Sequence, residues 1–421
     1  MNVKTFSAGV VLFAAAYSIR GQNASASAVA TPLAELLEEA ARKSPDILAA
    51  QHTWRAATHM RQQVTTLPNP QFTVQEFSVG SPRPFAAFNT SNFAYIGVGA
   101  SQELPYPGKL RLKGEAADRT AEAQQAQIAV TQASIADQVK TAYLRLGYLQ
   151  QTLELLERSR STLGQVIESE LLRYRTGAGN QADVLKVQLQ RTKLVRELTM
   201  HHEEMGQMQA DLKRLLHRSQ ESPDIIAQDL TMRTLHYSSL ELRDFVRRQN
   251  PHVKFEASTI EKQNALLRSA QRAGKPDFSV GYMYQRTGDD LPAYYMLTFN
   301  LIFQRRERVR AEVAEAAESL KSAQEQLEAR LQQQLAEVQK QYVAAKSTTD
   351  ELTQYREGMI PQADAGFHAV LAQYESNKQQ LDSVLMSFNE VLELKRGYAQ
   401  SLLEHETAIA RLESLTGVTL R

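Results

Sequence analysis

The stretch Pro276-Asp277-Phe278-Ser279-Val280-Gly281-Tyr282-Met283-Tyr284 decides the fold, because its beginning occurs twice in the chain. Pro70-Gln71-Phe72-Thr73-Val74 lies 206 positions earlier and has proline, phenylalanine and valine in the same places. A shift of 200 positions matches further pairs, among them Tyr174 with Tyr374, Val184 with Val384, and Leu185 with Leu385. The chain is therefore a tandem duplication of a unit of about 190 residues, far longer than the roughly 20–50 residues of a solenoid repeat.

Each copy is predicted to contain one β-hairpin. In residues 278–284 and again in 295–301, large apolar side chains alternate with small or polar ones. A period of two is typical of a strand with one apolar face. We expect hairpins at about 71–104 and 277–303. The residues expected on the apolar face of the second hairpin are Phe278, Val280, Tyr282, Tyr284, Tyr295, Leu297 and Phe299.

Long helices make up the rest of each copy. Residues 109–174 contain no proline, and their apolar side chains recur every seven positions, which is typical of a coiled coil. About 66 residues at ~1.5 Å each give a helix of roughly 100 Å. We expect a second long helix from Arg306 to Tyr374, interrupted near Gly358 and Pro361. The shorter helices are expected at about 32–67, broken near Pro45; 180–217; 239–273, broken near Pro251; and 380–416.

The expected fold class is mostly α with a small β part, in which two shorter helices stacked end to end lie along each long helix. Residues 1–28 are predicted to be a signal peptide, because Lys4 precedes the short apolar run Val10–Ala16 and small-residue cleavage motifs follow. The predicted organisation is then repeat 1 at 29–218, a linker at 219–235, and repeat 2 at 236–421, with long helical hairpins at 109–217 and 306–416.

Composition excludes several classes of function. The chain has no cysteine, so it has no disulfide, thiolate metal site or cysteine nucleophile. Basic and acidic residues nearly balance, which gives no indication of nucleic-acid binding. No segment after the signal peptide has the roughly 18 consecutive apolar residues of a transmembrane helix.

An exported chain with long alternating strands fits an outer membrane, which strands of about 9–11 residues can cross. Four strands cannot close a barrel alone; two chains would supply about 8 strands and three about 12, and strand number does not choose between them. The alternative is a soluble α+β protein whose hairpins pack on its own helices. The ~100 Å helix argues against it, because a compact core does not use such a helix.

Four features of the mature chain resemble the TolC-type outer-membrane efflux protein family. The first is the duplication itself, with a hairpin inserted in each copy. The second is Asn69-Pro70-Gln71-Phe72, and the third is Leu104-Pro105-Tyr106-Pro107-Gly108-Lys109-Leu110 with its degenerate partner 301–306. The fourth is Tyr174-x-x-Gly177-x5-Asp183-Val184-Leu185, echoed from Tyr374 to Leu385. The third motif is reminiscent of members that serve heavy-metal pumps.

This resemblance implies a homotrimer with a twelve-stranded barrel in outer-membrane lipid and an α-helical barrel in the periplasm. It implies a passive exit duct for efflux or type I secretion, with no catalytic residue and no cofactor. The expected partners are a periplasmic membrane-fusion adaptor and, through it, an inner-membrane pump of the RND or ABC type. The alternative is a soluble periplasmic coiled-coil adaptor or scaffold, but adaptors usually carry a lipoyl-like β domain, and none lies between Lys109 and His217.

The resemblance also implies roles for the turns between the long helices. The residues expected to dock the adaptor are Arg175, Thr176, Gly177, Ala178, Gly179, Ser376, Asn377 and Lys378. Those expected near the gate are Asp183, Tyr374, Asp382 and Ser383. Serine at 383 stands where the first copy has Asp183, and Gln379 stands where the family usually has a basic partner, so the closing contacts are expected to differ from the usual ones.

A metal site is not predicted. Met200, Glu204 and Met208 share one helical face, and two histidines lie beside them at 201 and 202. Neighbouring residues on a helix point about 100° apart, so the two histidines cannot chelate one ion together. Methionines on a helix usually fill a core. The sequence therefore indicates packing there.

Overall fold

The structure is a computed structural model. It describes residues 30–80, 83–84, 94–287, 292–376 and 378–420. The predicted signal peptide and Asn377, one of the expected docking residues, lie outside these described residues.

The two halves contain corresponding elements in the same order, except that the second long helix is divided into three parts, and this confirms the predicted fold class. In the first half these are α1 Leu33–Lys43, α2 Pro45–Thr65, β1 Gln71–Phe77, β2 Tyr95–Leu104, α3 Lys109–Arg175 and α4 Gln181–Leu215. In the second half they are α5 Ser239–Gln249, α6 Pro251–Ala273, β3 Asp277–Thr287, β4 Tyr294–Ile302, α7 Arg306–Gln354, the π-helical turn η1 Tyr355–Met359, α8 Ile360–Glu375 and α9 Leu381–Thr416.

The helix breaks predicted at the two prolines are present. Pro45 and Pro251 each occupy the first position of a new helix, where the missing amide hydrogen costs nothing. At the second break the side chain of Asn250 accepts hydrogen bonds from the backbone N–H groups of His252 and Val253, at 2.9 and 3.1 Å. The short helices α1 and α5 therefore turn away from the longer helices that follow them.

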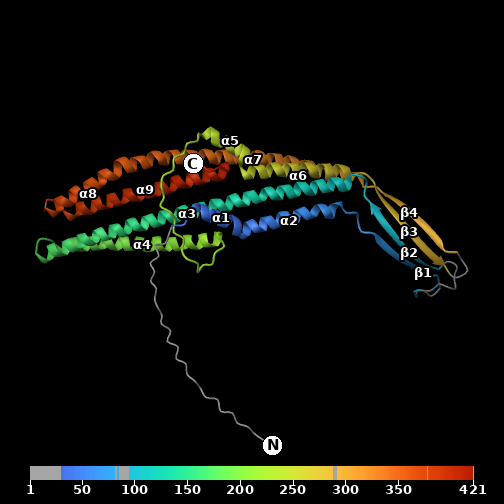
Figure 1. Cartoon of the computed structure of the whole chain (residues 1–421), viewed down its shortest axis with the longest axis horizontal. Coiled ribbons are helices and arrows are strands. Elements are labelled where there is room, and N and C mark those ends of the chain that lie inside the picture. The colour runs from blue at the N-terminus through green and yellow to red at the C-terminus, as the bar shows by residue number, and fades with distance from the viewer. Residues whose placement is uncertain (1–29, 81–82, 85–93, 288–291, 377, 421) are drawn as a thin grey trace, which may run out of the picture.

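The chain is elongated, with the four strands at one end and the turns between the long helices at the other (Figure 1). α3 has 67 residues and is about 100 Å long. Both α2 and α4 pack along α3, and both α6 and α9 pack along α7. This is the predicted arrangement of two shorter helices against one long helix, and α3 also packs on α6 and α9 to join the halves.

The second long helix differs from the first by the π-helical turn η1, which lies where the sequence analysis expected an interruption. Pro361 follows within the first two positions of α8 and cannot donate a hydrogen bond to the preceding turn. The Tyr355 ring at the start of the turn lies against Gly397 of α9; a Cβ atom there would come within 2.5 Å of the tyrosine hydroxyl. Repeat 1 has no such turn within α3.

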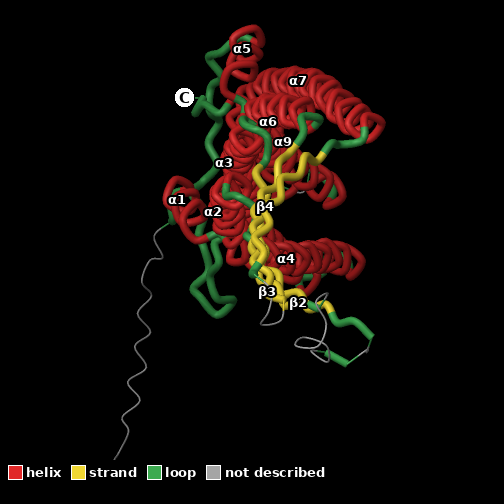
Figure 2. The backbone as a smooth tube through the Cα atoms, turned by 90° about the vertical axis from the view of Figure 1, so that its right-hand side faces the viewer, coloured by secondary structure: helices red, strands yellow, loops and turns green. Residues whose placement is uncertain are grey.

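Seen along its length, the molecule is an arc of helices, with α1 and α5 on the convex side (Figure 2). Its buried side chains form a series of clusters along the arc. Leu156, Leu194 and Val384 belong to the cluster nearest the turns, and Leu36 and Leu146 to the cluster under α1. The helices thus build a wall about one layer thick.

The strands form one antiparallel sheet in the order β1-β2-β3-β4. The two hairpins join through β2 and β3, with Tyr95 opposite Thr287 and Leu104 opposite Phe278. β1 and β4 each have one edge without a partner strand among the described residues. Among those residues, no helix is long and apolar enough to cross a membrane.

Candidate functional site

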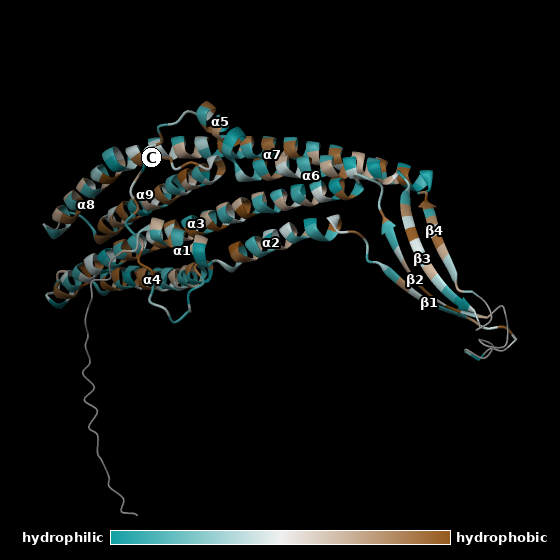
Figure 3. Cartoon of the chain, turned by 45° about the vertical axis from the view of Figure 1, so that its right-hand side comes forward, coloured by the Kyte–Doolittle hydropathy of each residue, from teal (hydrophilic) through white to brown (hydrophobic). Residues whose placement is uncertain are grey.

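The sheet has an apolar face that contains all seven residues predicted for it. The register places Phe278, Val280, Tyr282 and Tyr284 opposite Leu301, Phe299, Leu297 and Tyr295, respectively. Leu297 is 75% exposed and Tyr295 68%. Phe72 and Val74 extend the same face onto β1, through Ala100 and Val98 of β2. Figure 3 shows the resulting hydrophobic residues along the strands.

The residues of the opposite face of the sheet are mostly small or polar. On β2 it has Gly97, Gly99 and Ser101, which lie opposite Gln285, Met283 and Gly281. On β4 it has Thr298 and Asn300. Glycines suit this face because a Cβ atom at Gly99 would come within 2.9 Å of the Tyr282 carbonyl oxygen. The sheet therefore has one face suited to lipid and another suited to water.

A buried ion pair fixes the junction between strands and helices. Lys109, the first residue of α3, donates from Nζ to Oδ2 of Asp277, the first residue of β3, at 2.8 Å. The other carboxylate oxygen of Asp277 accepts from the backbone N–H of Tyr106 at 2.7 Å. The pair ties the return segment of repeat 1 to the strand of repeat 2. Gly108 allows that return because its φ of 91° lies in the left-handed region.

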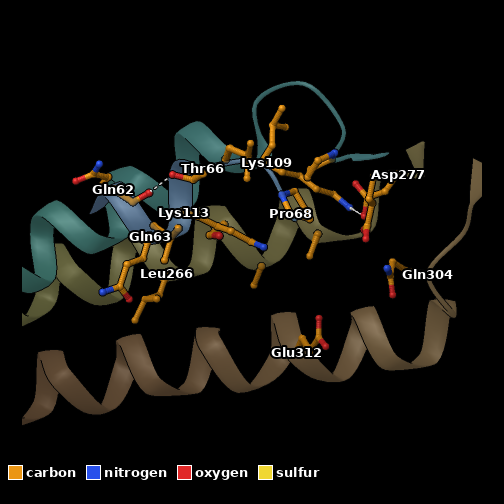
Figure 4. A pocket seen from close by; sticks show the side chains of 18 of the residues that line it. Gln62, Gln63, Thr66, Pro68, Lys109, Lys113, Leu266, Asp277, Gln304 and Glu312 are labelled. Atoms are coloured by element: carbon orange, nitrogen blue, oxygen red, sulfur yellow. Dashed lines mark hydrogen bonds and ion pairs between the residues drawn. The ribbon is translucent and has the colours of Figure 1, made fainter. Parts of the chain in front are cut away.

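A cavity of about 1150 Å³ lies beside this junction (Figure 4). Its lining is mostly polar and comes from α2, α3, α6 and α7, from β2 and β3, and from the segments that join strands and helices. It includes Gln63, Glu103, Lys113, Gln304 and Glu312. Glu103 lies opposite Ser279 in the sheet, so the cavity opens on the polar side.

The turn between α3 and α4 contains the first set of predicted docking residues. Gly177 has a φ of 75°, and the N–H groups of Gly177 and Ala178 donate to the carbonyls of Tyr174 and Arg173 at 3.1 and 2.8 Å. This double closure is a Schellman motif. Arg175, Thr176 and Ala178 are exposed, and Gly179 is partly buried.

The turn between α8 and α9 closes similarly, since the N–H of Lys378 donates to the Gln373 carbonyl at 2.8 Å. Ser376 and Lys378 are exposed there. Both turns lie at the end of the molecule opposite the sheet (Figure 1). The structure thus gathers the described docking residues at one end.

Tyr374, predicted near the gate, is buried between the two repeats. Its hydroxyl donates to a carboxylate oxygen of Glu170 on α3, and the Glu170 side chain is 1% exposed. The Arg173 guanidinium lies 4.7 Å from the centroid of the Tyr374 ring. Burial, and secondly the hydrogen bond to Glu170, raise the pKa of Tyr374 well above its ordinary value, so the phenol remains a donor.

The predicted acids Asp183 and Asp382 meet at a lysine. Nζ of Lys186 on α4 lies 3.6 Å from Asp183 and 2.7 Å from Asp382 of α9. Ser383 is partly buried and its N–H donates to the Gln380 carbonyl at 3.1 Å, so it begins the helix and does not replace Asp183. The four predicted gate residues are therefore close to the turns, but their partners come from outside the predicted set.

Comparison with known proteins agrees with this geometry. A model of the outer membrane efflux protein family matches residues 36–216. This part of the chain belongs to the outer membrane efflux protein family. Its members are channels of the outer membrane with a helical extension into the periplasm, and they are not enzymes.

Solved structures of outer-membrane proteins have the same fold. The outer-membrane channel OprN is 18% identical, with a TM-score of 0.78 over 91% of this chain and 89% of that one. VceC from Vibrio cholerae is 17% identical, with a TM-score of 0.76 over 92% and 97%. CusC is 15% identical, with a TM-score of 0.75 over 93% and 93%. No curated protein sequence matches the chain. These similarities do not separate a heavy-metal branch from the rest of the family.

Sequence analysis of this efflux protein missed Lys186 and Glu170. Lys186 lies on an exposed helix face, where a charged residue ordinarily meets water, and Glu170 is buried. Their partners are 196 and 204 positions away. The heptad pattern does indicate that Glu170 is buried, because it follows the buried Ile167 and Leu163 by three and seven positions on the same helix face. The polar seam continues away from the turns through two more cross-repeat pairs, Gln190 with Asn389 and Glu197 with Arg396.

Among the described residues, no group of three or more histidine, aspartate or glutamate side chains could hold a metal ion. Glu204, beside the two histidines, pairs with Arg145. His202 Nδ1 lies 2.7 Å from the Leu198 carbonyl oxygen of the preceding turn. These side chains take part in local contacts of the helical wall.

Proposed function

We propose that three copies of this efflux protein form the exit duct of a tripartite efflux or type I secretion system. The observation that carries this proposal is the four-stranded sheet with one apolar face, one polar face and two free edges. A free edge exposes unpaired backbone groups, which lipid cannot satisfy. β1 of one copy would pair with β4 of the next, and three copies would close twelve strands.

The curved helical wall supports the same assembly. One chain forms only an arc (Figure 2), and three arcs with their hollow sides together would enclose a tube. The apolar side chains Leu185 and Leu189 of α4 are 56% and 58% exposed in the single chain and lie on one helical face. A neighbouring copy would cover them.

Cysteine cross-linking tests the assembly, because the natural chain has no cysteine. Thr73→Cys on β1 and Asn300→Cys on β4 place one thiol at each free edge, both on the polar face. Oxidation or a short bis-maleimide in outer-membrane fractions should give covalent dimers and trimers and nothing larger. Each single variant is the matched control. Monomers alone, in membranes that contain the protein, would contradict the trimer.

We further propose that the exposed turns dock a periplasmic adaptor, through which an inner-membrane pump supplies cargo and energy. Thr176 and Ala178 are exposed at the tip, which supports this role. A photo-reactive residue at 178 should cross-link the co-expressed adaptor. The same residue at Val343, which is 54% exposed on α7 and is separated from the turns by η1 and α8, should not. Equal cross-linking at both positions would remove the tip assignment.

A further inference from the structure

The boundary between the sheet and the helices has a polar side and an apolar side. The last rungs of the sheet join Asp277 to Ile302 and Phe278 to Leu301. Just beyond them lie Tyr106 after β2 and Arg305 after β4. The polar side opens into the cavity lined by Gln304 and described above. The apolar side ends in a different group of residues.

On the apolar side, a row of aromatic rings leads to an arginine. The rings of Phe299 and Phe278 are 5.9 Å apart, and those of Phe278 and Tyr106 are 6.2 Å apart. The Arg272 guanidinium lies 4.9 Å from the centroid of Tyr106, and its Nη2 donates to the Pro107 carbonyl at 3.0 Å. Tyr106 and Pro107 thus hold one cation at the end of the apolar face.

Arg272 retains most of its hydrogen-bonding capacity. A guanidinium has five N–H donors, and the described contacts use one of them. Among the described residues no carboxylate pairs with Arg272, although its neighbour one turn earlier, Arg268, pairs with Glu115. A guanidinium that is held in place and has unused N–H donors is well suited to bind phosphate.

A second cation, Arg305, lies beyond the end of β4, at the same end of the apolar face. Phe303 is 72% exposed and continues the alternation of Phe299 and Leu301 beyond the end of β4. Gln304 lines the cavity, and Arg305 follows as the exposed N-cap of α7. A cation at a helix N-terminus is unfavourable, because the helix dipole is positive there. An external anion would offset that cost.

The two cations flank the same rung of the sheet. Arg272 precedes Asp277 through the last turn of α6, and Arg305 follows Ile302, the partner of Asp277. α6 and α7 are in contact there, since a Cβ atom on Gly274 would come within 3.0 Å of Val309. Both arginines therefore lie at the level where an apolar face that meets acyl chains gives way to water.

We propose that Arg272 and Arg305 bind the phosphate of an anionic phospholipid in the periplasmic leaflet, with its acyl chains against Phe278 and Phe303. The inference rests on the proposed function, because the apolar face must be in a membrane. Charge complementarity and the continuity of the aromatic row with the two arginines favour a lipid phosphate over a free one. Each arginine near an anionic membrane strengthens binding by about fivefold.

Native mass spectrometry of the purified assembly tests the site. The protein is equilibrated with vesicles of phosphatidylcholine alone or mixed with phosphatidylglycerol, and retained lipid is counted per chain. We expect phosphatidylglycerol to be retained preferentially. Arg272→Gln and Arg305→Gln should each lower its retention about fivefold, with a larger loss in the double variant.

Arg308→Gln is the matched control. Arg308 is an exposed arginine on the same helix, but it lines the cavity and pairs with Glu312 at 2.8 Å. It should leave retention unchanged. Equal retention of both lipids, or an equal loss in Arg308→Gln, would overturn the site. Displacement of the lipid by inorganic phosphate at millimolar concentration would also overturn it, because the acyl chains would then contribute nothing.

Pore formation by the same samples separates this inference from the proposed function. A wild-type sample that forms no conducting pores in planar bilayers counts against the duct. A sample that conducts but shows no preference for phosphatidylglycerol counts against the arginine site alone. Arg305 is exposed, so Arg305→Gln keeps the test valid if Arg272→Gln fails to assemble.

Discussion

Lys186 of α4 donates hydrogen bonds to both carboxylate oxygens of Asp382 of α9, at 2.7 and 2.8 Å, across 196 positions of sequence. The hydrogen bond to Asp382 raises the pKa of Lys186, so the lysine is charged at any physiological pH. Both side chains are largely exposed, at 45% and 64%. Exposed ion pairs are individually weak. This ion pair between the two helical hairpins could therefore be broken at low cost.

Lys186→Met should loosen the turns. The variant removes the cation that Asp183 and Asp382 share and leaves their two negative charges near each other. We expect single channels in planar bilayers to show a higher conductance or a longer open time than wild type. Salt screens exposed charges, so wild type should approach the variant as ionic strength rises toward 1 M.

Lys395→Met is the control for this prediction. Lys395 pairs with Asp364 at 2.9 Å and is also partly exposed, but both residues belong to the same helical hairpin. Its loss should leave conductance unchanged. If Lys395→Met opened the channel as much as Lys186→Met, the effect would come from general loosening and not from the contact between repeats.

Tyr374→Phe should destabilise the wall at the turns. The substitution removes the donor to Glu170, whose carboxylate is buried, and such a loss costs about 1–3 kcal/mol. We expect a lower midpoint of thermal unfolding, measured at a fixed protein concentration, and easier channel opening. Tyr174→Phe changes the corresponding tyrosine of repeat 1, which is 47% exposed, and should have little effect. Equal midpoints for the two variants would contradict the role of the buried contact.

Glu39→Gln should show its effect through pH. The hydrogen bond from Arg218, together with the one from Lys43, lowers the pKa of Glu39 from about 4.5 to about 2. A carboxylate with a lowered pKa stabilises the fold above its unfolded-state pKa, and this stabilisation is lost as pH falls through the folded-state value. The thermal midpoint of wild type should exceed that of Glu39→Gln above about pH 5, and the difference should shrink toward pH 2.

Glu38, the exposed neighbour of Glu39, provides the control for this prediction. Glu38→Gln should leave the midpoint close to wild type at every pH, because Glu38 is exposed and shows no ion pair in the described part of the chain. A difference between wild type and Glu39→Gln that stayed constant down to pH 2 would show that the glutamate acts through packing and not through its charge.

Sequence alone predicted the elements and the sheet face, because both depend on local period. The break at Pro251 and the alternation from Phe278 to Tyr284 are properties of adjacent residues. The pairing of β2 with β3 and the contacts of Lys186 and Glu170 join residues far apart in the chain. No local pattern states which distant carboxylate a charged helical residue will meet. The predicted gate residues could therefore be placed near the turns, but their partners could not be identified.

Tyr282→Lys tests the orientation of the sheet. Tyr282 lies on the apolar face opposite Leu297, and a lysine that faces lipid near the middle of a bilayer costs about 2–4 kcal/mol. We expect less assembled protein in the outer membrane, measured as heat-resistant oligomer in membrane fractions. Thr298→Lys places the same charge one rung away, on the polar face opposite Gly281, where it would meet water. That variant should assemble as wild type does. If Tyr282→Lys assembled normally and Thr298→Lys did not, the sheet would be inverted, with its aromatic face toward the interior of the tube.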